Sequence, residues 1–288
     1  MASTSPSSIP SALKNTSRNT LTNLDRTLTR LTSILANPVG TDKFLLTIYY
    51  ALKLLYPQIA RLRSHQTRKF LSAFTNKARF NLLPGESLIT ILETRDDGFL
   101  AQVEAGMRAG ASTISDVRMF MRLFALLGVY GMAKRTWSAP PKDTLTKAMA
   151  WGQVGSLVGY QVLENVAYLA GKGILKGERF SAEKQTRWFI VACRFWMAYV
   201  GLEAGRLLRD WQLNLTEEVR VEEKGQDAVE KRKNDVAAWR RAWYANAAYS
   251  PMTVHYSFEQ GCLNDEQLGF LGVIVGFIGF GHMWRQTA

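Results

Sequence analysis

The sequence predicts an all-α, membrane-associated protein built from amphipathic helices and one or two hydrophobic segments. Apolar residues recur at three- and four-residue steps over most of the 288 residues, which is the period of one helix face. No stretch of useful length alternates apolar and polar residues as a strand does. A run of 18 residues near the C-terminus, 267–284, contains no Lys, Arg, Asp or Glu, and this is about the length that crosses a bilayer.

The first 20 residues are rich in Ser and Thr, contain Lys14 and Arg18, and hold no acidic residue. We expect them to form a disordered tail ahead of a single helical membrane domain over residues 21–288. The same composition is typical of a mitochondrial transit peptide, so a mitochondrial membrane is the alternative location.

A first helix is predicted over residues 21–35 because leucines recur there on one helix face. These are Leu21, Leu24, Leu28, Leu31 and Leu35. The stretch NPVGTDK then breaks the helix, and Thr41 or Asp42 is the expected N-cap of a second helix that starts near Phe44. Pro57 permits a new helix to start in its first turn.

Residues 58–80 form a predicted basic amphipathic helix, with six Lys or Arg residues between 61 and 80 and no acidic one. The apolar side, the expected membrane-insertion face, contains Ile59, Leu62, Phe70, Phe74 and Phe80. The cations expected to contact lipid headgroups are Arg61, Arg68, Lys69 and Arg79. Arg63 and Lys77 depart from the pattern because they fall among the apolar residues. The spacing alone fits a core helix with a charged outer face equally well.

The positive charge is concentrated in the first half of the chain. Residues 1–135 hold 18 Lys or Arg against 8 acidic residues, a net charge of +10, whereas residues 136–288 hold 18 against 16, a net charge of +2. Nucleic acid would attract this charge, but no helix-turn-helix, RRM, zinc-finger or KH signature accompanies it. We therefore expect anionic lipid headgroups as the partner, and no nucleic acid.

The middle of the chain is a series of helices separated by breaks. A second helical group covers about 87–135, and two adjacent prolines in TWSAPPKD end it. Further helices are predicted at 143–170, 181–212 and 236–249. Between the last two, residues 213–235 are expected to be a charged linker or a fully exposed helix.

Three segments are apolar enough to contact a bilayer. The C-terminal segment 267–284 carries a glycine stripe that includes Gly272 and Gly276. Segments 151–171 and 188–205 contain the similarly spaced pairs Gly155–Gly159 and Gly201–Gly205. Such pairs predict close helix packing and oligomerisation in a membrane.

Charged residues inside these segments limit how many of them span. Because segment 151–171 contains Glu164, it fits a second membrane span and a packed helix equally well. Arg194 and Glu203 favour a buried or interfacial helix for segment 188–205. Acidic residues precede the C-terminal segment and Arg285 follows it, which favours a cytosolic C-terminus.

No motif for catalysis is found. His65, His255 and His282 stand in unrelated contexts, and no GxSxG, phosphate-loop or dinucleotide motif is complete. The two cysteines, Cys193 and Cys262, lie far apart and suit a reducing compartment. We expect no enzyme, cofactor or metal.

Two stretches, residues 116–134 with Arg118 and Arg122 and residues 160–177 with Glu164 and Asn165, together resemble the peroxin-eleven family of peroxisomal membrane-elongation factors. The first, DVRMFMRLFALLGVYGMAK (116–134), is similar to the Arg/Leu-rich segment of that family and contains Arg118 and Arg122. The second, YQVLENVAYLAGKGILKG (160–177), resembles the second family signature. The matching positions of the second signature are Tyr160, Glu164, Asn165, Tyr168, Leu169, Gly173 and Ile174.

The resemblance implies a non-enzymatic protein of the peroxisomal membrane with its termini toward the cytosol. Such proteins self-associate, insert a basic amphipathic helix to curve and elongate the membrane, and assist dynamin-type fission machinery. By character, that helix corresponds to residues 59–80. Two other classes remain open. One is a pore or metabolite channel, suggested by the charges inside apolar segments. The other is a helical adaptor that recruits fission machinery.

Overall fold

The computed structural model describes residues 11–79, 98–221 and 226–287. In chain order its helices are α1 (Ser11–Leu35), α2 (Pro38–Arg79), α3 (Phe99–Arg122), α4 (Ala125–Ser138), α5 (Thr144–Gly171), the short 3-10 helix η1 (Glu178–Phe180), α6 (Ala182–Val221), α7 (Gln226–Tyr256) and α8 (Asp265–Gln286). These residues contain no strand, so the predicted all-α class is confirmed.

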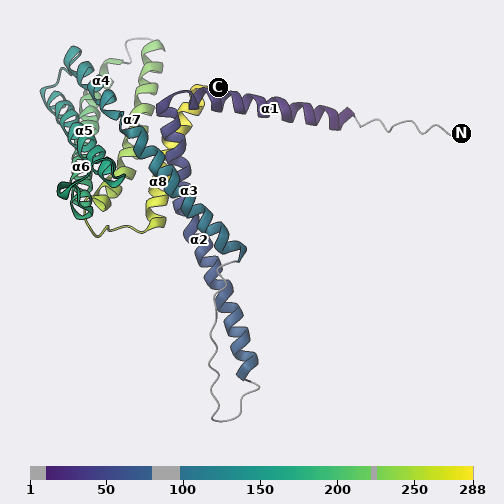
Figure 1. Ribbon diagram of the computed structural model, residues 1–288. Coiled ribbons are helices and arrows are strands. Elements are labelled where there is room, and N and C mark those ends of the chain that lie inside the picture. Colours follow the sequence, from purple (N-terminus) through teal and green to yellow (C-terminus); the bar gives the residue numbers. More distant parts are fainter. Residues whose placement is uncertain (1–10, 80–97, 222–225, 288) are drawn as a thin grey trace.

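The helices form two groups that pack against each other (Figure 1). In one group α2 lies along α8 and is covered by α3, and in the other α5 lies along α6 beside α4. Helix α7 contacts both α6 and α8 and joins the groups. The core between α2, α7 and α8 consists of Leu46, Tyr50, Ala248, Met252, Leu268 and Val275.

Helix α1 projects sideways from the bundle (Figure 1). It begins at Ser11, so the second half of the segment predicted to be a disordered tail, residues 11–20, is helical. The first ten residues lie outside the described part of the chain. The leucine repeat that predicted a helix over 21–35 therefore belongs to a helix that starts ten residues earlier.

Helix α2 is longer than the sequence predicted. It starts at Pro38, and the side chain of Asn37 caps it by accepting a hydrogen bond from the Val39 amide at 2.9 Å. The prediction of a start near Phe44, capped by Thr41 or Asp42, is therefore wrong. The helix also continues through Pro57, so the predicted new start there is wrong as well.

The charged stretch 213–235 is helical wherever the structure describes it. It extends α6 to Val221 and supplies the first turns of α7 from Gln226 (Figure 1). Of the two forms expected for this stretch, the helix is the one observed in residues 213–221 and 226–235, and residues 222–225 lie outside the description.

Helix α8 contains the whole C-terminal apolar segment. The Asn264 side chain and the Gln267 side chain form a capping box at its start. Among the described helices, α8 alone has the length and composition of a membrane span, with a mean hydropathy of 1.4 over its most apolar window. Segments 151–171 and 188–205 lie within α5 and α6, which pack along each other.

Candidate functional site

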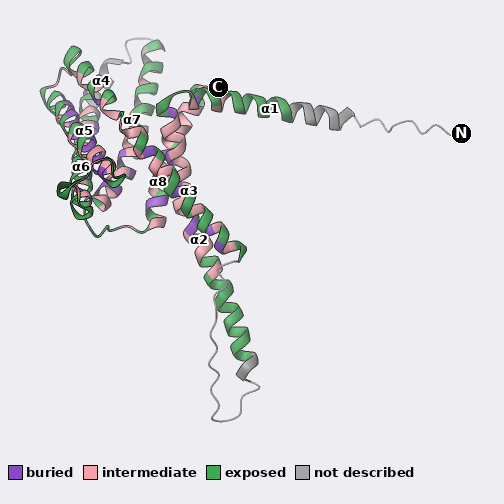
Figure 2. Cartoon of the chain, in the orientation of Figure 1, coloured by how far each residue is buried: buried purple, intermediate pink, exposed green. Residues whose placement is uncertain are grey.

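The second half of α2 is a basic arm, defined here as residues 58–79, that extends beyond the helix bundle (Figure 2). Every residue from Ser64 to Asn76 is exposed. This part of α2 therefore leaves the core, and the alternative of a core helix with one charged face is wrong for it.

The predicted insertion face of the basic arm is open to solvent. Leu62, Phe70 and Phe74 are 53%, 62% and 40% exposed. The Phe70 and Phe74 rings are stacked side by side with centroids 6.5 Å apart, so they form one apolar ridge. Ile59, at the base of the arm, is half-buried, and Phe80 lies outside the described residues.

The cations of the arm fall into two sets. Arg68 and Lys69 are exposed along the projecting part. Arg61 instead forms an ion pair with Glu266 of α8 at 2.7 Å, so in this structure its charge is already partly neutralised by the protein. Arg63, one of the two cations that depart from the amphipathic pattern, forms an ion pair with Glu104 of α3 at 3.4 Å. The side chains of Lys77 and Arg79 lie outside the described residues.

The base of the arm is fastened to the first turn of α8. The Lys53 ammonium lies 3.0 Å from the Asp265 carboxylate, and the Tyr56 hydroxyl donates a hydrogen bond to the same group. Burial and this hydrogen bond raise the pKa of Tyr56 to about 12. The Gln58 amide adds a 3.2 Å hydrogen bond to Glu266. The arm therefore begins at the N-terminal end of the candidate span.

The glycine stripe of α8 is filled by α2 of the same chain. A Cβ atom on Gly272 would overlap the Tyr50 ring, and one on Gly276 would lie 2.5 Å from the Thr47 Oγ1 atom. The α8 pair thus serves the close helix packing expected of it. Because α2 occupies this face, these glycines are not open to a second copy in this structure.

The two glycines of α5 lie in different surroundings. A Cβ atom on Gly159 would lie 2.8 Å from the Phe195 ring of α6, whereas one on Gly155 would meet no atom within 4 Å. On α6, Gly205 faces the Met149 sulfur and Gly201 is open. Only one glycine of each pair is therefore used for packing inside the chain.

The two sequence signatures meet where α3 ends beside α5. Arg122 of α3 forms an ion pair with Glu164 of α5 at 3.0 Å, and the Tyr160 hydroxyl donates a 2.8 Å hydrogen bond to Glu164. The Asn165 side chain donates to the Leu123 carbonyl oxygen at 3.3 Å. We call this group the signature clasp, because it fastens α3 to α5.

The second signature also anchors the end of α5. The Tyr168 hydroxyl donates to Asp116 of α3 at 3.3 Å, and Lys172 forms a 2.6 Å ion pair with the same carboxylate. The Leu169 carbonyl accepts the amide of Ile174, which closes the turn after the helix. Gly173 lies in this turn at φ +71°, a conformation that favours glycine.

Two acidic residues that bind residues of the sequence signatures were not predicted from the sequence. Asp116 is one, and Asp42, which binds the buried Arg118 at 2.9 Å, is the other. The local sequence around Asp42 indicates only a helix cap. Its partner lies 76 residues away in the chain, so no local pattern connects the two.

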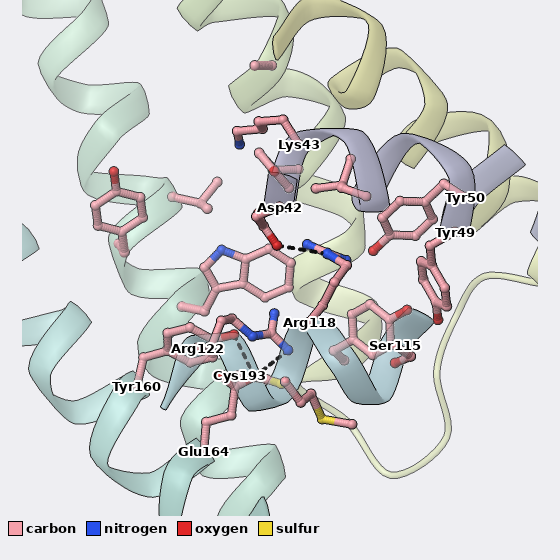
Figure 3. Close-up of a pocket in the computed structure, with 18 of the residues that line it drawn as sticks. Asp42, Lys43, Tyr49, Tyr50, Ser115, Arg118, Arg122, Tyr160, Glu164 and Cys193 are labelled. Atoms are coloured by element: carbon pink, nitrogen blue, oxygen red, sulfur yellow. Dashed lines mark hydrogen bonds and ion pairs between the residues drawn. The ribbon is translucent and has the colours of Figure 1, made fainter. Parts of the chain in front are cut away.

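Between the two helix groups lies a cavity of about 520 Å³, lined by α2, α3, α5, α6 and α7 (Figure 3). Arg118, Arg122 and Glu164 border it together with Asp42, Lys43 and Glu203. Aromatic side chains complete the wall: Tyr49, Tyr50, Tyr160, Phe189, Trp196, Tyr199, Tyr249 and Tyr256. The cavity therefore has a mixed apolar and charged lining, with basic and acidic groups in equal number among its charged side chains.

Two buried atoms of the signature clasp, Arg122 Nε and Glu164 Oε2, have no hydrogen-bond partner among the described residues. Such atoms can bind water or a small polar solute. Burial raises the pKa of the Cys193 thiol beside them to about 12, so that thiol stays protonated and unreactive at neutral pH. Arg194, by contrast, points toward the Ser257 carbonyl oxygen at 3.3 Å.

Comparison with known proteins identifies a family. The family model described as Peroxisomal biogenesis factor 11 (PEX11) matches residues 96–284, more than half of the 288-residue chain. The matched region contains both signatures, the cavity wall from α3 to α7, and most of α8, whereas α1 and α2 precede it. No curated protein and no solved structure matches the chain.

Proposed function

The chain belongs to the peroxisomal biogenesis factor 11 family, and we propose that it curves and elongates the peroxisomal membrane by inserting its basic arm as a wedge. Family membership locates the protein in the peroxisomal membrane and gives it a role in peroxisome proliferation and division. The proposal concerns how it does so. The observation that carries it is the exposed ridge of Phe70 and Phe74 on a projecting cationic helix.

The composition of the arm suits a bilayer surface. Burying the exposed parts of Leu62, Phe70 and Phe74 in the acyl boundary would contribute on the order of 3–5 kcal/mol. Each cation near an anionic leaflet, such as Arg68 and Lys69, adds up to about 1 kcal/mol. Together these two contributions support reversible binding of the arm to a membrane surface. Because the helix is already formed in the protein, little entropy is lost in ordering it on binding.

The arm has to turn in order to lie in the membrane surface. It continues the axis of α2, whose first half packs along the candidate span α8. Pro57 stands at the junction, where it removes one backbone hydrogen bond from the helix and makes this turn the easiest one to bend. A bend there would bring the Phe70 and Phe74 ridge to the membrane.

The test is membrane tubulation by the full chain reconstituted in liposomes that contain anionic lipid. The double substitution Phe70→Glu with Phe74→Glu should abolish tubulation, because it places two acidic groups on the insertion ridge. The matched control is Ser72→Glu with Asn76→Glu, which makes the same charge change on the opposite face of the same helix. The control should retain most of the tubulation.

Tubulation by Phe70→Glu with Phe74→Glu that equals tubulation by the parent chain would contradict the wedge. Equal loss in the two double variants would show that the arm acts through its net charge rather than through its apolar ridge. Circular dichroism and gel filtration of each variant establish that it is folded before the liposome assay. Both pairs of residues are exposed, so the fold should tolerate all four substitutions.

Self-association would concentrate several wedges on one membrane patch, and we include it in the proposal. A curved neck made in this way is the surface on which dynamin-type fission machinery would assemble. Anionic peroxisomal lipids are the proposed ligand of Arg68 and Lys69. Glu266 would compete with these lipids for Arg61, since the pair is exposed enough for headgroups to reach.

A pore for small solutes is the second candidate. It is favoured by one observation, the cavity that both Glu164 and Glu203 line although they lie in different helices. Conductance in planar bilayers that persists with Phe70→Glu and Phe74→Glu, and whose ion selectivity changes with Glu203→Gln, would support a pore. Absence of conductance in the parent chain would exclude it.

A further inference from the structure

The contacts that α2 makes just before Pro57 attach it to the bundle. Lys53 forms an ion pair with Asp265 of α8 at 3.0 Å. On another side of the helix, the Arg108 guanidinium of α3 lies 4.2 Å from the centre of the Tyr56 ring. All of these residues lie on the bundle side of the turn at which α2 bends most easily, so their contacts persist when the arm turns.

The first turns of the basic arm itself are held by two acidic residues, and we call these contacts the brace. Glu266 of α8 accepts a 3.2 Å hydrogen bond from the Gln58 amide and forms a 2.7 Å ion pair with Arg61. Glu104 of α3 forms a 3.4 Å ion pair with Arg63. Arg61 and Arg63 are two positions apart, which is about 200° around a helix. The two acids therefore hold opposite sides of the arm.

The brace ends where the arm becomes fully exposed. Arg63 is half-buried, whereas every residue from Ser64 to Asn76 is exposed (Figure 2). Glu104 is only 7% exposed. Its Oε1 atom accepts a 3.0 Å hydrogen bond from Arg108, but its buried Oε2 atom has no hydrogen-bond partner among the described residues. A buried carboxylate is stabilised by neighbouring cations, so Glu104 favours the straight arm, in which Arg63 stays beside it.

We propose that the brace keeps the arm straight, and its phenylalanine ridge away from the membrane, until anionic lipid headgroups displace the two acids. This inference rests on the proposed wedge and names what controls it. A bend at Pro57 moves the arm relative to α8 and α3, so it has to separate Arg61 from Glu266 and Arg63 from Glu104. The contacts made before Pro57 are not affected by the bend.

Anionic lipid has the chemistry to release the brace. The Arg61 side chain is 67% exposed and lies beside the first turn of α8, which is at the level of the headgroups if α8 spans the membrane. Phosphate oxygens bind a guanidinium in the same bidentate manner as a carboxylate does. A leaflet offers many such groups at once, whereas Glu266 offers one carboxylate. Because exposed ion pairs are weak, a moderate rise in anionic lipid is enough to open this one.

The test measures the bend of the arm through the distance between two spin labels. The labels are attached to Ser72→Cys in the arm and Gln286→Cys at the far end of α8, in the full chain with Cys262→Ser. Cys193 stays because it is only 3% exposed. At 1.5 Å per helical residue, the labels should lie roughly 50 Å apart on a straight arm and roughly 35–40 Å apart after a right-angle bend at Pro57.

The arm should be straight in vesicles of phosphatidylcholine and should bend as phosphatidylserine replaces part of that lipid. At a given phosphatidylserine fraction, Glu266→Gln should raise the ratio of bent to straight arms about two- to fivefold, because one side of the brace is lost. The matched control is Glu259→Gln, which makes the same charge change at an exposed position in the connection that precedes α8. It should leave the ratio unchanged.

A second variant removes the same contact from the side of the arm. Arg61→Gln changes the net charge in the opposite direction to Glu266→Gln. In vesicles of phosphatidylcholine, where no anionic lipid attracts the arm, both variants should broaden the distance distribution relative to the parent chain. A broader distribution in only one of the two would mean that net charge, and not the contact, sets the position of the arm.

Three further results would overturn the brace. They are a bent arm in the parent chain without anionic lipid, equal ratios for Glu266→Gln and the parent at every phosphatidylserine fraction, and an equal rise with Glu259→Gln. Tubulation is measured on the same vesicles. A parent chain that tubulates while Glu266→Gln leaves the ratio unchanged removes this inference alone. A parent chain whose arm bends with phosphatidylserine but does not tubulate removes the wedge and leaves the brace.

Discussion

At the residue scale, the family signatures act as structural fasteners. Arg122, Glu164 and Tyr160 join α3 to α5 through a hydrogen bond and through an ion pair between the half-buried Arg122 and the buried Glu164. A charged pair of this kind costs desolvation when it forms, but losing one partner costs more, because the other charge is left buried and uncompensated. The pair therefore specifies which helices meet.

Removing the acid of this pair should destabilise the protein strongly. We expect Glu164→Gln to lower the free energy of unfolding by about 3 kcal/mol, since Arg122 then keeps an uncompensated charge beside the cavity. The double variant Arg122→Met with Glu164→Leu should lose less of its free energy of unfolding than Glu164→Gln, because it leaves no unpaired charge. Chemical denaturation in detergent measures both.

The matched control is Glu183→Gln, which breaks the exposed pair between Glu183 and Arg187 on α6. It should change the free energy of unfolding by about 0.5 kcal/mol or less. If Glu164→Gln unfolds at the same denaturant concentration as the control, the signature clasp has no structural role.

At the element scale, the pairing of α2 with α8 depends on glycine. Without Cβ atoms at Gly269 and Gly272, the α8 backbone approaches the Leu54 backbone and the Tyr50 ring of α2. The same helix α2 then continues into the basic arm. The glycine stripe therefore packs the candidate span against the helix that carries the basic arm.

Adding one methyl group to this stripe should separate the two helices. Gly272→Ala would place a Cβ atom inside the Tyr50 ring, and we expect a loss of about 1–3 kcal/mol from overpacking. Gly281→Ala is the control on the same helix, because no atom lies within 4 Å of its added Cβ. It should instead stabilise the helix by about 0.5–1 kcal/mol.

Thermal unfolding in detergent distinguishes the two variants, because Gly272→Ala should lower the unfolding temperature and Gly281→Ala should raise it. A Gly272→Ala variant as stable as the parent, but with fewer cross-linked oligomers, would mean that the stripe faces a second copy rather than α2.

At the scale of the whole molecule, the two projections lie at opposite ends of α8. The basic arm starts beside Glu266, in the first turn of the candidate span, whereas α1 is held at Trp284, in the last. If α8 spans the membrane, the arm and the C-terminus lie on opposite sides of it. The C-terminus and the arm therefore cannot both be on the cytosolic side. A wedge that makes an organelle bulge outward must enter the outer leaflet, so the arm end is the one we place in the cytosol.

Cys262 provides a natural probe of this orientation. It is exposed and lies three positions before α8, at the same end as the arm. In intact peroxisomes we expect a membrane-impermeant maleimide to label Cys262. Cys193 should remain unlabelled because it is buried and its pKa is raised to about 12. The Cys262→Ser variant is the control for the label. Labelling only after the membrane is permeabilised would place the arm in the matrix and exclude an outer-leaflet wedge.

The sequence alone determined the helical class, the extent of the apolar segment in α8, and the amphipathic character of the arm and of α1. These properties follow from the periodicity of apolar residues within one segment of the chain, and this periodicity can be read from the local sequence. The two signatures were also recognisable, because each is contiguous in sequence. The start of α2 was misjudged because Asn37 with Pro38 caps a helix as well as Thr41 does.

Only the tertiary structure decided which surfaces are free. The glycines of α8 have the spacing of an oligomer contact but are covered by α2, whereas Leu21, Leu24 and Leu28 of α1 have the spacing of a core face and are exposed. Likewise Arg61 is paired and Arg68 is exposed, although both belong to one cationic pattern. The physical reason is that periodicity specifies a face, while contacts between residues distant in sequence determine what covers it.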